Sequence, residues 1–191
     1  MSGAPPLLAL EGVSCRRGGR LLFEALDLRL EAGGAALVRG PNGAGKSSLL
    51  RLAAGLLAPA AGRVERGGAA ALADERTALD ERLTLGRALD FWARLDGGQA
   101  ETGMAPMGLL VLAALPVRML STGQRKRAVL ARLIAAGADL WLLDEPANGL
   151  DADGAERLAA AIAGHRAAGG AVLAASHQPL GLPDAQRVRL G

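Results

Sequence analysis

The sequence is poor in cysteine, aromatic residues and lysine, and it contains no tyrosine. Its 191 residues include one cysteine, two phenylalanines and two tryptophans. The single cysteine, Cys15, excludes an internal disulfide and is typical of a chain in a reducing compartment. So few aromatic rings cannot stack the bases of a nucleic acid along a groove. The net charge of +3 therefore does not predict nucleic-acid binding.

Long hydrophobic runs are also missing. No stretch reaches the roughly 18 to 20 apolar residues that a membrane span needs. The N-terminus lacks the basic start and apolar centre of a secretory signal. We therefore expect a cytoplasmic chain that is at most peripheral to a membrane, and the length favours a single domain, residues 1–191.

A phosphate loop is the most specific motif present. Residues 40–47 match the pattern Gly-x-x-x-x-Gly-Lys-Ser/Thr in full. The glycines let successive backbone N–H groups point toward phosphate oxygens at the start of a helix. Lys46 can reach the β- and γ-phosphates of ATP, and the Ser47 hydroxyl can bind Mg²⁺. The candidate ATP-binding residues of this loop are Gly40, Pro41, Asn42, Gly43, Ala44, Gly45, Lys46, Ser47 and Ser48.

Strands and helices alternate along the rest of the chain. Residues 7–13 and 26–30 have strand periodicity, and residues 58–62 are expected to end a helix over 47–54. The other predicted elements are strands over 35–38, 69–72, 140–143 and 171–175 and helices over 108–114, 122–136 and 153–168. This order predicts an α/β fold of the P-loop NTPase kind. We expect a mainly parallel sheet, an N-terminal antiparallel β portion and a helical subdomain at about 80–135.

Two carboxylates follow an apolar strand. Asp144 and Glu145 come directly after residues 140–143, and parallel sheets bind ligands at the carboxyl ends of their strands. Asp144 can therefore bind Mg²⁺, while Glu145 can orient or deprotonate the water that attacks the γ-phosphate. In a chain without a phosphate loop, the same pair could equally be solvated turn residues.

Residues 120–124, Leu-Ser-Thr-Gly-Gln, form a second motif. Ser121 and Gln124 have the spacing of a capping box at the start of a helix. A capped helix N-terminus with Gly123 beside it is also suited to a phosphate group. The two interpretations are compatible.

Together these motifs resemble those of ABC-transporter ATPase domains, over nearly the whole chain. Residues 120–124 match the family signature LSGGQ except at Thr122. The resemblance implies ATP and Mg²⁺ as ligands and a dimer that forms on ATP binding. In that dimer, Ser121, Gly123 and Gln124 of one subunit close over the nucleotide of the other.

Two further motifs agree with this resemblance. Residues 147–151 look like the family's D-loop, which implies that Asp151 lies at the dimer contact. His177 follows the last predicted strand and looks like the switch histidine, which implies a hydrogen bond to the γ-phosphate. Glu145 and His177 are then the candidate catalytic residues. We expect the other histidine, His165, at the surface.

Four short sequence motifs narrow the resemblance to haem-export ATPases of cytochrome c maturation. They are residues 15–20, 22–23, 148–151 and the His-Gln-Pro-Leu run at 177–180. The resemblance implies an ATPase at the cytoplasmic face of the bacterial inner membrane. It also implies an integral membrane partner like CcmB and other cytochrome c maturation proteins. The chain itself has no recognisable haem site, because its histidines and its cysteine have other interpretations.

Two departures from the family pattern leave alternatives open. The glutamine usual after the strand over 69–72 is missing, since residues 73–77 read Ala-Asp-Glu-Arg-Thr. The usual adenine-stacking tyrosine is also absent, and we predict that Arg16 stacks on the base instead. The alternatives are the ATPase subunit of another ABC exporter, a soluble ABC ATPase without a transport role, and a nucleotide switch that does not hydrolyse ATP.

Overall fold

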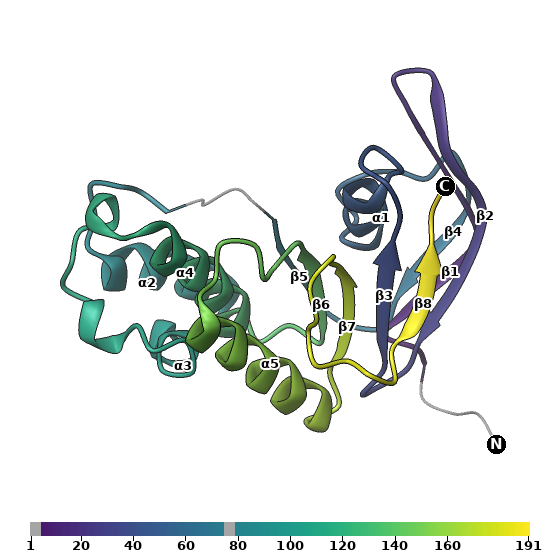
Figure 1. Ribbon diagram of the computed structural model, residues 1–191. Helices are drawn as coiled ribbons and strands as arrows, with labels where there is room; N and C mark the ends of the chain where they lie inside the picture. Colours follow the sequence, from purple (N-terminus) through teal and green to yellow (C-terminus); the bar gives the residue numbers. More distant parts are fainter. Residues whose placement is uncertain (1–4, 75–78) are drawn as a thin grey trace.

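Two β-sheets occupy one side of the molecule and a group of helices the other (Figure 1). The computed structural model describes residues 5–74 and 79–191. Residues 75–77 of the run that replaces the expected glutamine lie outside the described residues. Ala73 ends a strand of the parallel sheet. The structure is an α/β fold with one parallel and one antiparallel sheet, as the sequence predicts.

The antiparallel sheet contains β1 (Leu8–Arg17), β2 (Arg20–Leu30) and β4 (Ala61–Arg66), in the order β2-β1-β4. β1 and β2 form one long hairpin that extends beyond both predicted strands. Gly18 and Gly19 make its turn, and both have positive φ, 53° and 78°, as a tight hairpin turn requires. β4 was not predicted, and the expected helix end at 58–62 is wrong in part because this strand starts there.

The parallel sheet has the order β5-β6-β7-β3-β8. Its strands are β3 (Ala35–Arg39), β5 (Ala70–Ala73), β6 (Leu140–Asp144), β7 (Ala171–Ala175) and β8 (Gln186–Arg189). All four neighbouring pairs run parallel. The sequence predicts every strand of this sheet except β8. An edge strand with a single buried residue, Val188, gives no clear apolar pattern.

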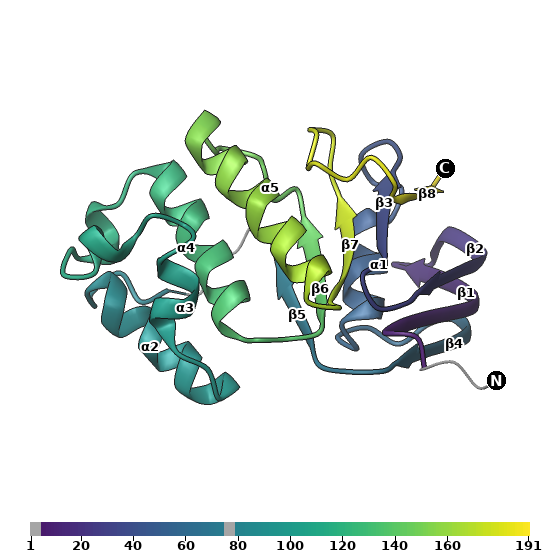
Figure 2. The same cartoon turned by 90° about the horizontal axis from the view of Figure 1, so that it is seen from below.

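The sheet is covered on both faces (Figure 2), because successive side chains along each strand point to opposite faces. Leu140 and Leu142 of β6 pack in one cluster with α1 (Lys46–Ala53) and the antiparallel sheet. Trp141 and Leu143 pack in the other cluster, with α5 (Ala152–Ala167) and the remaining helices. α1, which begins at the phosphate loop, therefore lies between the two sheets.

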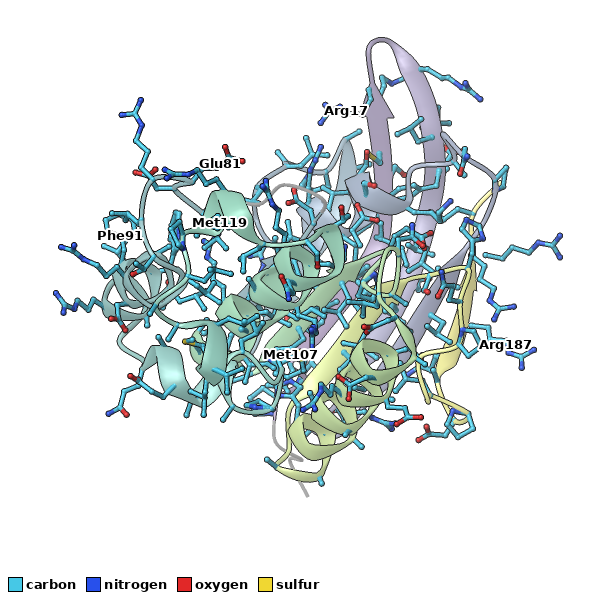
Figure 3. The ribbon with its side chains drawn as sticks, turned by 60° about the vertical axis from the view of Figure 1, so that its left-hand side comes forward. Arg17, Glu81, Phe91, Met107, Met119 and Arg187 are labelled. Carbon is cyan, nitrogen blue, oxygen red and sulfur yellow. The ribbon has the colours of Figure 1, made fainter. Side chains whose placement is uncertain are left out.

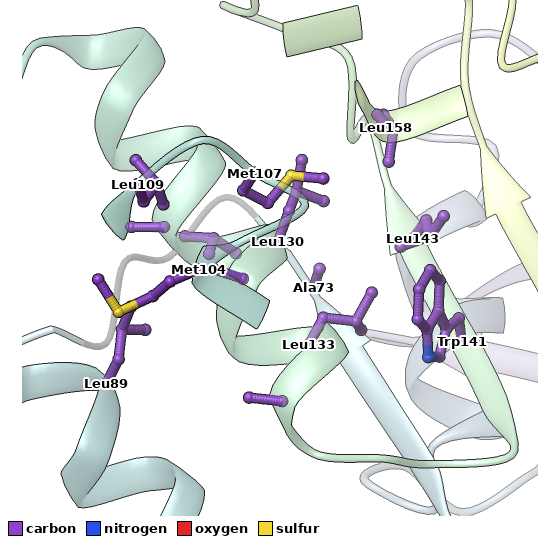
Figure 4. Packing of buried hydrophobic residues seen from close by; sticks show 14 of the residues in the cluster. Ala73, Leu89, Met104, Met107, Leu109, Leu130, Leu133, Trp141, Leu143 and Leu158 are labelled. Atoms are coloured by element: carbon purple, nitrogen blue, oxygen red, sulfur yellow. The ribbon is translucent and has the colours of Figure 1, made fainter. Parts of the chain in front are cut away.

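The helical side consists of α2 (Leu85–Asp96), α3 (Ala100–Met104) and α4 (Thr122–Ala135). Met104, Met107, Leu109 and Leu130 lie buried among these helices (Figure 4). The helix predicted over 108–114 is wrong, because only a 3₁₀ turn forms there, at Leu110–Leu112. Gly108 has φ +65° and cannot continue a helix, and the short apolar run that follows it is too brief to form a stable α-helix.

His165 is half-buried and not a plain surface residue. Its ring stacks on the indole of Trp141, with the ring centroids 4.0 Å apart and the planes inclined by 7°. Its Nε2 lies 3.3 Å from the carbonyl oxygen of Ala171. The expectation of a surface position is wrong because the alanine-rich helix leaves space beside Trp141 that the imidazole fills.

Candidate nucleotide-binding site

The phosphate loop joins β3 to α1 and forms one wall of a cavity of about 520 Å³. The hairpin β1–β2 forms a second wall. The end of β5 and the two acids after β6 close the remaining side. The cavity thus lies at the carboxyl ends of parallel strands and at a helix N-terminus, which is where a polyphosphate is bound in such folds.

Glycine is required in the loop for two different reasons. Gly43 and Gly45 have φ of +81° and +104°, a backbone conformation that residues with a Cβ atom disfavour. A Cβ on Gly45 would also lie 3.1 Å from Leu22 Cβ and 3.1 Å from Phe23 Cδ1 of the hairpin. The loop and the hairpin can touch only because residue 45 has no side chain.

The Lys46 side chain folds back over the phosphate loop. The residue is 9% exposed, and its Nζ donates hydrogen bonds to the carbonyl oxygens of Gly40 and Pro41 at 2.9 and 3.2 Å. The ammonium group is therefore held at the mouth of the backbone N–H cradle. Phosphate oxygens entering the loop can take over as its partners.

The two predicted catalytic residues lie together. The backbone N–H of His177 donates to Glu145 Oε2 at 3.2 Å, and His177 Nε2 lies 3.4 Å from Glu145 Oε1. The Glu145 side chain is 14% exposed, whereas that of His177 is 60% exposed. A partly buried carboxylate beside an accessible imidazole can hold a water and move its proton.

Glu145 has an unusual backbone conformation. Its φ is +44°, and its N–H donates to the carbonyl oxygen of Ala175 at 2.8 Å. A non-glycine residue in the left-handed region costs about 1–3 kcal/mol. The hydrogen bond to β7 holds this turn, which brings the carboxylate to the cavity wall next to Asp144.

Ser47 and Asp144 fit a magnesium ion that shares nucleotide oxygens. Both residues line the cavity, and hydroxyl and carboxylate oxygens suit this hard cation. Within residues 5–74 and 79–191, no cluster of three or more His, Cys, Asp or Glu side chains could hold a metal ion. Phosphate oxygens would therefore have to complete the coordination shell.

The signature residues form the capping box at the start of α4. Ser121 Oγ accepts from the Gln124 N–H at 3.2 Å, and Gln124 Oε1 accepts from the Ser121 N–H at 2.9 Å. A Cβ on Gly123 would lie 3.2 Å from the Gly149 carbonyl oxygen, so this segment packs against residues 147–151. Asp151 caps α5 through a 2.8 Å bond from the Gly154 N–H. None of these residues lines the phosphate-loop cavity.

The wall of the cavity includes residues that sequence reasoning missed: Arg17, Leu22, Arg51 and Asp74. Arg16 does not line it, and its Nη1 donates to the Gly19 carbonyl oxygen at 3.1 Å. Strand alternation could have indicated Arg17, because it shares a face of β1 with the buried Cys15. Gly40, Pro41 and Ala44 of the loop do not line the cavity either.

Comparison with known proteins identifies the class. The family of ABC transporters matches residues 23–148. The solved ATP-binding subunit of an ABC transporter has the same fold, with a TM-score of 0.84 at 22% identity over 96% of this chain and 85% of that one. A putative ABC transporter ATP-binding protein from Pyrococcus furiosus gives 0.82 at 22% identity over 96% of each chain. The chain belongs to the ABC transporter family, in which it is an ATP-binding subunit and an ATPase.

Its sequence relatives are more particular. The "Cytochrome c biogenesis ATP-binding export protein CcmA" of Sphingopyxis alaskensis is 62% identical over 188 residues, 97% of each chain. The protein of that name from Novosphingobium aromaticivorans is 57% identical over 183 residues, 95% of this chain and 93% of that protein. The narrower resemblance seen in the sequence, to ATPases of cytochrome c maturation, is therefore confirmed. Among the helices of the described residues, none has the length and hydropathy for crossing a membrane.

Proposed function

We propose that this ATPase supports haem export and delivery for the maturation of c-type cytochromes. It acts at the cytoplasmic face of the bacterial inner membrane, on an integral membrane subunit like CcmB and with other cytochrome c maturation proteins. The observation that carries the proposal is 62% identity to a CcmA protein over 97% of both chains. In addition, Lys46 and Ser47 of the phosphate loop line the same cavity as Asp144 and Glu145.

ATP binds with its phosphates in the loop. The Lys46 ammonium exchanges its two carbonyl partners for the β- and γ-phosphates, and the backbone N–H groups of residues 43–47 surround the β-phosphate. Ser47 and Asp144 would hold Mg²⁺ together with phosphate oxygens. The ion, when bound, neutralises charge that develops on the transferred phosphoryl group.

Glu145 accepts a proton from the attacking water, or orients that water toward the γ-phosphate. His177 lies on the open side of the carboxylate and can donate a hydrogen bond to a γ-phosphate oxygen. The short distance between the two side chains, 3.4 Å, supports a shared role, because both groups then contact the same small volume beside the phosphate.

Two copies of the chain close over the nucleotide. Ser121, Gly123 and Gln124 lie outside the cavity of their own chain, at an exposed helix N-terminus. A free, capped N-terminus favours an anionic group. The γ-phosphate held in a second copy is such a group. Asp151, two residues after the Gly149 that packs on Gly123, would lie at the same dimer contact.

In this proposal the partner proteins bind the haem. The His177 ring contacts Glu145 and the His165 ring stacks on Trp141, while Cys15 is buried. Both histidines and the cysteine of the described residues thus have protein neighbours, and the proposal gives this chain the role of energy supply.

Dimer formation is tested by substituting the catalytic carboxylate. Glu145→Gln removes the proton acceptor but keeps the side-chain volume, so ATP should trap a dimer that light scattering detects. Glu156→Gln is the matched control, because Glu156 is an exposed residue of α5. A monomer at saturating ATP with Glu145→Gln contradicts the closed dimer.

The biological role is tested by haem staining of c-type cytochromes in a strain that lacks the gene. We expect loss of c-type haem with normal b-type spectra, restored by the wild-type gene and by Glu156→Gln but not by Glu145→Gln. Unchanged c-type cytochromes would discard the haem role and favour another ABC exporter. Absence of phosphate release by the wild-type complex would instead favour a nucleotide switch.

A further inference from the structure

We propose that the Arg17 guanidinium and the Leu22 side chain form the platform on which the base of the nucleotide stacks. The inference rests on ATP binding in the phosphate-loop cavity. It concerns how the base of ATP is held when no aromatic side chain of the described cavity wall can stack on it. Among the described residues that line the cavity, none is aromatic and none is histidine.

The hairpin places both residues next to the phosphate loop. Cys15 pairs with Phe23 and Arg16 with Leu21, so Leu22 is an extra residue without a partner in β1. Such a β-bulge turns a side chain out of the normal alternation, and bulges are common beside active sites. Here Leu22 reaches the loop: its Cβ is 3.1 Å from the position that a Cβ on Gly45 would have.

Arg17 lies on the inner face of the same hairpin. It is two residues after Cys15, which is buried, so both side chains leave β1 on one face. Burial raises the pKa of the Cys15 thiol, and the Arg17 charge and a hydrogen bond with Ser48 oppose that rise. Arg17 is therefore close to the start of α1, and it extends away from the hairpin strands (Figure 3).

Among the described residues, two arginines line the cavity, Arg17 and Arg51, and Arg51 forms an ion pair. Arg51 Nη2 lies 3.8 Å from Asp74 Oδ2. Arg16 lies on the opposite face of β1 and donates to Gly19. Arg17 is thus the planar cationic group beside the apolar Leu22. A guanidinium plane stacks on a π-system, and an aliphatic side chain beside it covers the rest of the base.

The experiment separates base binding from phosphate binding. Isothermal titration calorimetry of the full chain measures the Kd of MgATP and that of magnesium tripolyphosphate, which has no base. Arg17→Ala should weaken MgATP binding about tenfold and leave tripolyphosphate binding unchanged. Arg17→Lys should lose the same affinity for ATP, because it keeps the charge but not the plane, and Arg17→Trp should restore it.

Arg20→Ala is the matched control. Arg20 pairs with Arg17 across the hairpin and is exposed, so its loss removes an equal charge from the same turn. Equal weakening of ATP and tripolyphosphate by Arg17→Ala would overturn the proposal and make Arg17 a phosphate contact. A loss of ATP affinity with Arg16→Ala, and none with Arg17→Ala, would overturn it in favour of Arg16. Failure of the wild-type chain to bind either ligand would instead refute nucleotide binding itself.

Discussion

The contact between Gly45 and the hairpin gives the sharpest stability prediction. In Gly45→Ala the new methyl group meets Leu22 Cβ and Phe23 Cδ1 at 3.1 Å, and the Leu22 Cβ cannot move without its backbone. Overpacking of this kind costs about 1–3 kcal/mol. The positive φ of residue 45 adds about 1–2 kcal/mol for any residue with a Cβ. We therefore expect the free energy of unfolding to fall by about 2–5 kcal/mol, the sum of the two.

Gly137→Ala is the control for the backbone term. Gly137 has φ +61° and no atom within 4 Å of the added Cβ, so it should lose only the strain energy, about 1–2 kcal/mol. Urea unfolding followed by circular dichroism gives both values, and calorimetry gives ATP affinity. Gly45→Ala should also lose ATP affinity, while Gly137→Ala should keep it. If the two variants are equally stable and bind ATP equally, the close contact between loop and hairpin is refuted.

Three other predictions follow from single contacts. Burial lowers the pKa of His165 below its usual 6.5. Between these two pKa values the unfolded chain binds a proton on His165 that the folded chain does not. The free energy of unfolding should therefore fall as the pH drops below about 6.5. Urea titrations in which His165→Gln keeps the same pH dependence would contradict this. Arg132 lies 3.5 Å from the centroid of the Trp92 ring, and a double-mutant cycle of Arg132→Gln with Trp92→Leu should give a coupling energy of about 0.5–2 kcal/mol; simple additivity would exclude the interaction. Arg66 donates to two carbonyl oxygens at the end of α1, at 2.6 and 3.1 Å, so Arg66→Ala should lower the unfolding free energy by about 1–3 kcal/mol in chemical denaturation, and an unchanged midpoint would be inconsistent with those bonds.

Local sequence decides the parts of this protein in which neighbours along the chain make the structure. The phosphate loop is one such part, because its glycines set the backbone of their own turn. The capping box of Ser121 and Gln124 is another, since its two hydrogen bonds span only three residues. The strand that ends at Asp144 can also be predicted from the sequence, because a central parallel strand is apolar on both faces.

Only the tertiary structure decides which residues meet across the fold. Pairing across the hairpin leaves Leu22 as a bulge beside the phosphate loop, and a bulge is a property of strand pairing that one strand alone does not reveal. β4 and β8 depend on pairing with distant strands. The 3.4 Å approach of His177 to Glu145 needs β6 and β7 side by side. These contacts arise between residues far apart in the chain, so their energies are not present in any local pattern.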